Sequence, residues 1–140
     1  MMKTGSTLIK LAKHKVDSVQ MLISAAERTR EDIERKKGDL LVSEKRERTR
    51  AEADPGMMSH WVAYSQVLVA QRANLEASLV GVEEQLEALR GDLQAAFEEQ
   101  KKFEMLEERR VSRANTSKAK REQAFLDEAA LIRAARRNIA

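Results

Sequence analysis

Apolar residues recur along the first part of the chain at alternating steps of three and four. The positions at this spacing are Ile9, Ala12, Val16, Val19, Ile23, Ala26, Arg30, Ile33, Lys37 and Leu40. This heptad spacing predicts a helix with one continuous apolar seam. Two exceptions, Arg30 and Lys37, have long stems that can lie on the seam while the charge reaches water. The seam is expected to stop after Leu40, because residues 44–52 are highly charged.

The strongest helix breaker follows this charged stretch. Asp54, Pro55 and Gly56 come in succession, which is typical of a turn in which proline fixes φ and glycine adopts a positive φ. Ser59 is the expected N-cap of the helix that comes next. We therefore predict a first helix over about residues 4–52, a turn over about 53–59 and a second helix over about 60–138.

The second helix has a seam at the same spacing. Its positions are Trp61, Ser65, Leu68, Arg72, Leu75, Leu79, Val82, Leu86, Leu89, Leu93, Ala96, Gln100 and Phe103. Two long helices joined by a short turn pack against each other in opposite directions. The predicted fold class is therefore all-α, a single domain over residues 1–140 that forms an antiparallel coiled-coil hairpin, with the second helix longer and overhanging at its C-terminal end.

The position of the turn also predicts the register, in which facing residue numbers add to roughly 113. Ile23 then meets Leu89, and Ile9 lies near Phe103. Charges of opposite sign face each other in this register, with Arg30 opposite Glu83 and Glu84. Lys37 likewise lies opposite Glu76. The first helix runs out near Arg109, so the second continues without a partner.

Composition supports long helices and argues against most enzyme chemistry. Charged residues make up 35% of the chain, aromatic residues 4%, and there is no cysteine, which excludes disulfides and thiolate metal sites. His14 and His60 stand on different arms without a second ligand at metal spacing, and the sequence holds no phosphate-binding glycine motif. Adjacent carboxylates such as Glu83 and Glu84 do not share a helix face. We expect no catalytic residues, no metal and no cofactor.

Neither a membrane span nor a secretory signal is expected. The longest apolar runs are a few residues, and residues 1–15 carry charge without an apolar core. A cytoplasmic protein without direct membrane insertion is therefore expected.

Charge is unevenly distributed although the net charge is only +3. Residues 3–15 contain lysines and no acid, residues 76–108 are mainly acidic, and residues from Arg109 onward are mainly basic. The last part also carries apolar residues at helical spacing, namely Phe125, Ala129, Ile132, Ala135 and Ile139. A lone helix cannot bury such a stripe, so this overhang is expected either to fray or to bind a partner. Nucleic acid is the weaker candidate, because acids are interspersed and no recognised nucleic-acid module is present.

Two interpretations are open for Trp61 and Tyr64. Their rings either close the tip of the hairpin against Leu40 and Leu41, or form an exposed anchor for a partner, with Leu68 one turn further on.

Nearly the whole chain resembles the flagellar FliJ family in its alphaproteobacterial form. The segments that carry the resemblance are Leu8-Ile9-Lys10-Leu11 through Val16-Asp17, Asp54-Pro55 ahead of the aromatic-bearing helix start at Trp61 and Tyr64, residues 71–79, residues 95–110, and Arg121-Glu122-Gln123 through Asp127-Glu128-Ala129-Ala130. The family has no catalytic signature, so the order and spacing of these segments carry the resemblance.

The resemblance implies a stalk-like coiled coil of the flagellar type III export apparatus, at the cytoplasmic face of the basal body. Its implied partners are the hexameric export ATPase, the membrane export-gate protein and, for some members, export chaperones. The residues expected at the ATPase are Lys10, Lys13, Arg121, Phe125, Ile132, Arg133 and Arg136. Those expected at the export gate are Trp61, Tyr64 and Leu68. The alternative is a generic cytoplasmic scaffold or chaperone adaptor without an ATPase partner.

Overall fold

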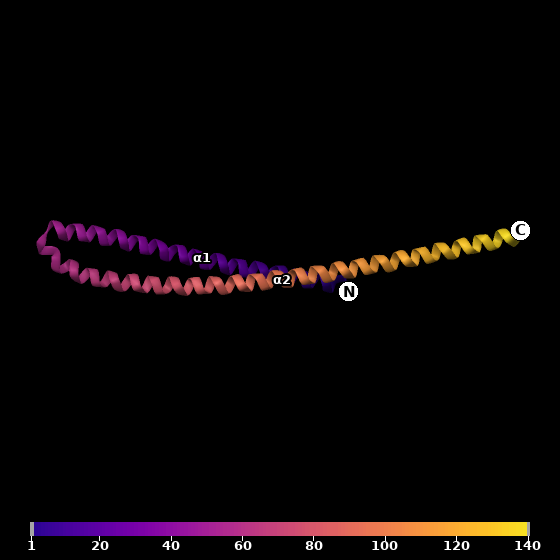
Figure 1. Ribbon diagram of the computed structural model, residues 1–140, viewed down its shortest axis with the longest axis horizontal. Helices are drawn as coiled ribbons and strands as arrows, with labels where there is room; N and C mark the ends of the chain where they lie inside the picture. Colours follow the sequence, from indigo (N-terminus) through magenta and orange to yellow (C-terminus); the bar gives the residue numbers. More distant parts are fainter. Residues whose placement is uncertain (1, 140) are drawn as a thin grey trace. The chain divides into compact units, whose positions relative to one another are not determined.

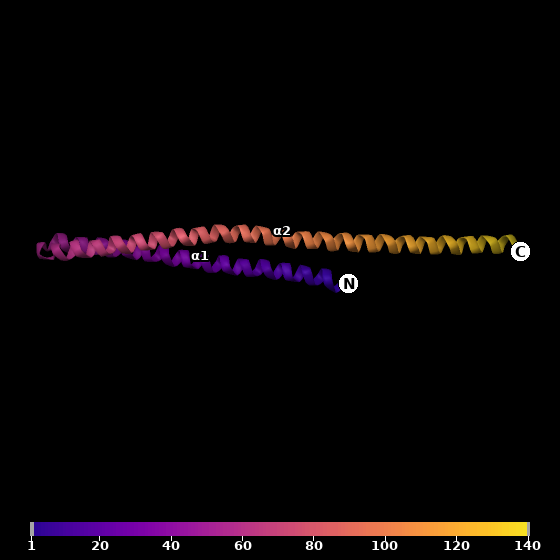
Figure 2. The same cartoon turned by 90° about the horizontal axis from the view of Figure 1, so that it is seen from below.

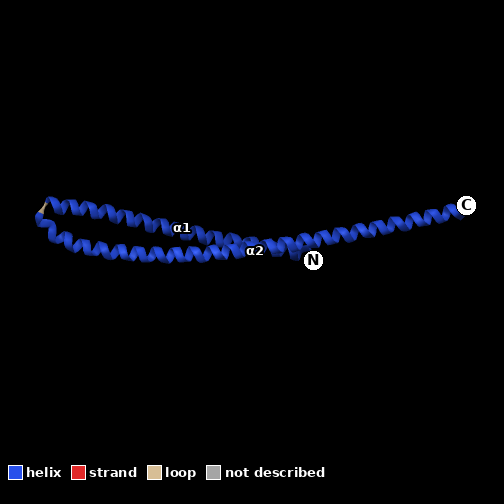
Figure 3. Ribbon diagram, in the orientation of Figure 1, coloured by secondary structure: helices blue, strands red, loops and turns tan. Residues whose placement is uncertain are grey.

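The computed structural model describes residues 2–139, and in this range the chain is helical apart from its turn (Figure 3). Helix α1 spans Met2–Ala53, a short 3₁₀ helix η1 spans Pro55–Met57, and α2 spans Met58–Ile139. The predicted all-α fold class is confirmed, since the described range holds two long helices and no strand, consistent with a helical hairpin coiled coil.

The chain divides into two compact units, His14–Ala96 and Met1–Lys13 with Phe97–Ala140. The first unit contains the turn and the two helical arms that lead to and from it. The second contains the N-terminal part of α1 and the C-terminal part of α2. A single domain over residues 1–140 stays a prediction, and Met1 and Ala140 lie outside the described residues.

Within residues 14–96 the two arms run side by side in opposite directions (Figures 1 and 2). Every predicted seam position in this unit is buried or half-buried, whereas most residues between them are exposed. The centre of the core is formed by Ala26, Leu86 and Leu89, with Ile23 and Val82 packed against it. Leu86 retains 1% of its exposure. Burial of this stripe stabilises the unit, because long helices in water depend on packing of one apolar face.

The predicted register agrees with the packing of the apolar residues in this unit. Ile23 and Leu89 belong to one cluster, as the register requires. However, no ion pair among the described residues joins Arg30 to Glu83 or Glu84. An ion pair between the two arms joins Arg72 to Glu44. Arg30 is half-buried in the seam and both glutamates point outward into water, where pairing contributes little.

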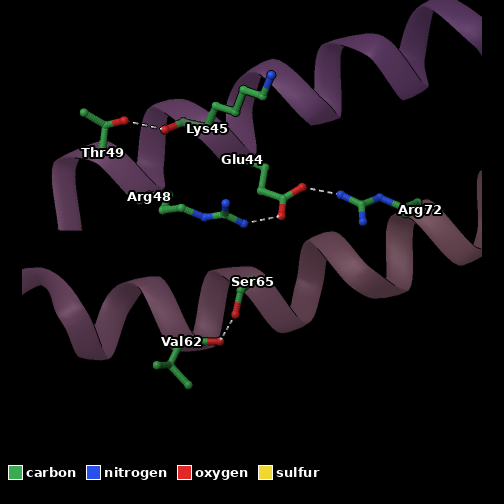
Figure 4. A network of polar contacts seen from close by, with 7 residues as sticks. All are labelled: Glu44, Lys45, Arg48, Thr49, Val62, Ser65 and Arg72. Carbon is green, nitrogen blue, oxygen red and sulfur yellow. Dashed lines mark hydrogen bonds and ion pairs between the residues drawn. The ribbon is translucent and has the colours of Figure 1, made fainter. Parts of the chain in front are cut away.

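The prediction that the first seam stops after Leu40 is also wrong. Its spacing continues through Glu44, Glu47 and Ala51, and Ala51 retains only 3% of its exposure. Glu44 is accommodated because two guanidinium groups donate to its carboxylate, Arg48 at 3.1 Å and Arg72 from the other arm (Figure 4). A charged side chain can take a seam position when such partners compensate its partial burial.

The turn differs from its predicted chemistry. Asp54, not Ser59, is the capping residue, since its side chain accepts a hydrogen bond from the Gly56 N–H at 3.0 Å. Pro55 then begins η1, which leads directly into α2 through Met58 in right-handed helical geometry. No residue in the described range has a positive φ, because the chain reverses through η1 rather than through a left-handed glycine.

We expect the Glu44–Arg72 pair to couple the two arms more strongly than a pair within one helix. A double-mutant cycle with Glu44→Ala and Arg72→Ala is expected to give a coupling energy of about 0.5–1.5 kcal/mol in urea unfolding. The matched control is the cycle for Asp32 and Arg35, an i, i+3 pair on the surface of α1 with 59% and 69% side-chain exposure. That cycle is expected to give about 0–0.5 kcal/mol. Equal coupling energies in the two cycles would contradict a role for Glu44 between the arms.

Candidate functional site

In the unit that holds both ends of the chain, close approach of the helices is marked by Gly5. A Cβ atom at this position would collide with the Glu107 carboxylate, so the absence of a side chain makes room for it. Arg110 donates two hydrogen bonds to that carboxylate, at 3.1 and 2.7 Å. The last half-buried residues before the overhang are Glu107 and Arg110.

The hydrogen bonds from Arg110 lower the pKa of Glu107, although burial acts in the opposite direction. The same hydrogen bonds raise the pKa of Arg110. Since the folded-state pKa of Glu107 lies below its unfolded value, the stabilisation by this pair is present above the ordinary carboxyl range. It is lost as pH falls through the lowered value.

Beyond Arg110, no other described part of the chain covers helix α2. From Val111 to Ile139 every residue is exposed except Ala129, which is half-buried. We call residues 111–139 the overhang. Its large apolar side chains are open to solvent, with Phe125 at 71%, Leu131 at 71% and Ile132 at 49% exposure. The apolar side chains of the overhang therefore remain uncovered within this chain.

The overhang is also basic. It contains seven lysines and arginines against three acids: Arg113, Lys118, Lys120, Arg121, Arg133, Arg136 and Arg137 against Glu122, Asp127 and Glu128. A shallow groove on its surface is lined by Lys118, Arg121, Glu122, Phe125 and Leu126. Positive charge and exposed apolar side chains thus occur on the same helical segment.

The residues predicted at the ATPase fall into two groups. Arg121, Phe125, Ile132, Arg133 and Arg136 all lie on the overhang, and Arg121 and Phe125 share the groove. Lys10 and Lys13 are exposed on α1. They lie on the paired part of this unit, because Gly5, nearer the start of α1, already faces Glu107. The structure does not bring these lysines next to the overhang residues.

The second candidate surface is at the tip of the hairpin. Trp61 and Tyr64 line a pocket of about 400 Å³ together with Glu47, Ala51, Met57 and His60. They do not share it with Leu40, which lines a different groove beside Leu75. The guanidinium of Arg48 lies 5.8 Å from the centre of the Trp61 ring. Leu68 retains 3% of its exposure and belongs to the seam, so it supports the tip from inside.

Sequence reasoning missed four of the six residues that line this pocket. Glu47 and Ala51 lie on the continuation of the first seam, which could have been found by extending the three-and-four spacing past Leu40. Met57 and His60 carry no such periodic signal. The turn places them there, because η1 and the first turn of α2 follow directly after Asp54.

The described residues contain no group of three or more histidine, cysteine, aspartate or glutamate side chains that could hold a metal ion. Over the same range, neither helix contains an apolar stretch that could cross a membrane.

Comparison with known proteins identifies the family. Residues 3–138 match the family described as "FliJ: Flagellar FliJ protein". No curated protein and no solved structure matches the chain. Because the family match covers essentially the whole chain, the protein belongs to the FliJ family, whose members are non-enzymatic components of the flagellar export apparatus.

Proposed function

We propose that this FliJ protein is a stalk-like part of the flagellar type III export apparatus, which binds the hexameric export ATPase through its overhang. The tip of the hairpin contacts the membrane export gate, and export chaperones are a further class of partner. The protein acts in the cytoplasm, at the cytoplasmic face of the basal body, and catalyses no reaction itself.

The observation that carries this proposal is the uncovered overhang. An isolated helix leaves its apolar side chains in water, which costs about 25 cal/mol for each Å² of apolar surface left exposed. Phe125, Leu131 and Ile132 would gain this free energy on binding a protein surface. The surrounding arginines and lysines favour an acidic surface and speed association with it.

Lys10 and Lys13 are proposed to contribute less to ATPase binding than the residues of the overhang. Both are exposed lysines on the paired part of the same unit as the overhang. Such residues at the rim of an interface raise the association rate more than the affinity. Arg121, Phe125, Ile132, Arg133 and Arg136 are therefore proposed as the main ATPase-binding residues.

At the tip, Trp61 and Tyr64 are proposed to contact the export gate. Tyr64 is 38% exposed and Trp61 is half-buried, so both retain surface that a partner can cover. Aromatic side chains of this kind commonly provide much of the binding energy at protein interfaces. Leu68 acts indirectly, because it fills the seam beneath the tip.

The test is stimulation of the export ATPase by the purified chain. A truncated chain that ends at Arg110 is expected to lose the stimulation, because it lacks the whole overhang. A full-length chain with Phe125→Ala and Ile132→Ala is expected to weaken it through loss of apolar contact. The matched control carries Leu22→Ala and Met21→Ala, two exposed apolar residues of α1 outside the overhang, and is expected to stimulate normally.

Two results would contradict the proposal. Equal stimulation by the full and truncated chains, both helical by circular dichroism, would remove the overhang from the mechanism. Recovery of export chaperones in a pull-down that never recovers the ATPase would instead favour the alternative, an adaptor without an ATPase partner.

A further inference from the structure

The pocket at the tip has an aromatic wall and a small floor. Its residues come from three consecutive elements: Glu47 and Ala51 from the last turns of α1, Met57 from η1, and His60, Trp61 and Tyr64 from the first turns of α2. Ala51 is almost fully buried, so the floor is a methyl group that leaves room above it. Its volume of about 400 Å³ is sufficient for one long side chain from another molecule.

One face of the Trp61 ring already interacts with a cation in this chain. The Arg48 guanidinium lies 5.8 Å from the ring centre, within the range of a cation–π interaction. Arg48 does not line the pocket, so the cation that it supplies is outside the cavity. Tyr64, one turn further along α2, adds a second aromatic ring to the pocket wall.

The pocket has an acidic charge that its own walls do not balance. Glu47 is one lining residue, and no lysine or arginine lines the cavity. Arg50, which does not line the pocket, forms an i, i+3 ion pair with Oε1 of Glu47 at 3.1 Å. This pair lies at the surface, and the Arg50 side chain is 65% exposed. A surface pair of this type contributes little, so the carboxylate can still favour a second cation.

We propose that this pocket binds an arginine side chain of a partner protein. The planar guanidinium stacks on the Trp61 and Tyr64 rings, and its N–H groups donate to the Glu47 carboxylate. The methylene stem lies against Met57 and Ala51. Arginine suits the site better than an apolar anchor, because leucine or norleucine would remove water from Glu47 without offering a hydrogen bond.

This proposal adds a binding chemistry to the role proposed for the tip. It rests on the proposed function in one respect only, namely the identity of the protein that supplies the arginine. The binding chemistry follows from the pocket itself, so it can be tested without the export gate. It is also independent of the overhang, which lies in the other unit.

Trp61 is the single tryptophan of the chain, so its indole N–H gives one assignable nuclear magnetic resonance signal. The full-length chain is titrated with N-acetyl-arginine amide at pH 8. The matched probe is N-acetyl-norleucine amide, which has a similar apolar stem and no charge. The arginine probe is expected to shift the Trp61 signal in a saturable way at millimolar concentrations, and the norleucine probe is not.

Substitutions then distinguish the contribution of the Glu47 charge to binding from that of the aromatic pocket wall. Glu47→Gln keeps the size of the side chain and is expected to weaken binding of the arginine probe about five-fold or more. Tyr64→Leu is expected to weaken it about three-fold. Glu52→Gln, at an exposed acid of the same arm that does not line the pocket, is expected to bind like the parent chain.

Three outcomes would overturn the proposal. These are the absence of any saturable shift with the arginine probe, an equal shift with norleucine, or unchanged binding after Glu47→Gln in a variant whose circular dichroism matches the parent. Loss of ATPase stimulation in an overhang variant leaves these results unaffected, so failure of the pocket and failure of the stalk proposal can be told apart.

Discussion

Replacing Leu86 with alanine is expected to lower the free energy of unfolding by about 2–5 kcal/mol. Leu86 retains 1% of its exposure and lies in the cluster with Ala26 and Leu89. A hairpin of two helices has no further layer that could move in to fill the space, so most of the cavity would remain. The loss would amount to a large share of the stability of a small domain.

The control for this substitution is Leu22→Ala. Leu22 lies on α1 in the same unit and is 54% exposed, so the same atoms are deleted without opening a cavity. Its effect is expected to stay within about 0.5 kcal/mol. Urea unfolding followed by circular dichroism measures both variants, and similar midpoints would show that Leu86 is not part of a tightly packed core.

The residues of the seam were predictable because, in a long helix that packs on one side only, the spacing of the apolar residues follows the side that is buried. A residue such as Ala26 or Leu86 is buried because it recurs on the face that meets the other helix. The polar members Arg30, Lys37, Ser65 and Arg72 follow the same rule, since all four are half-buried. Their position on the helix decides their burial more than their polarity does.

The acidic end of the first seam was not predictable from local sequence. Glu44 occupies a seam position because Arg72 donates to it from 28 residues further along the chain. Taken alone, residues 44–52 look like a solvated charged stretch, and their partner becomes known only after the arms are placed in register. The turn shows a similar limit, since Asp54 and Ser59 are both good caps and η1 decides between them.

The candidate sites were predictable to different degrees. The overhang follows from helix lengths and register, so the sequence already indicated an exposed basic segment that includes Phe125 and Ile132. The tip was predicted only as the aromatic residues Trp61 and Tyr64. Its pocket depends on Glu47 and Ala51, which come from the other side of the turn, and on how closely η1 joins the two helices. The partners assigned to both surfaces remain proposals.

The triple substitution Gly38→Ala, Gly81→Ala and Gly91→Ala is expected to raise the free energy of unfolding by about 2–3 kcal/mol. All three glycines lie inside helices of the same unit, and an added Cβ at each would meet nothing within 4 Å. Alanine therefore restricts the unfolded chain without disturbing the folded one.

Gly5→Ala is the contrasting substitution in this glycine test, because its Cβ would displace the Glu107 carboxylate from its position beside Arg110. We expect it to give less stabilisation than any one of the three single variants in thermal and urea unfolding. A gain from Gly5→Ala equal to theirs would contradict the close approach at residue 5. No gain from the triple variant would mean that the folded helices do not accept the three added methyl groups without strain. If the triple variant is more stable yet stimulates the export ATPase less, the glycines contribute flexibility that the proposed stalk function uses, at a cost in stability of about 1 kcal/mol each.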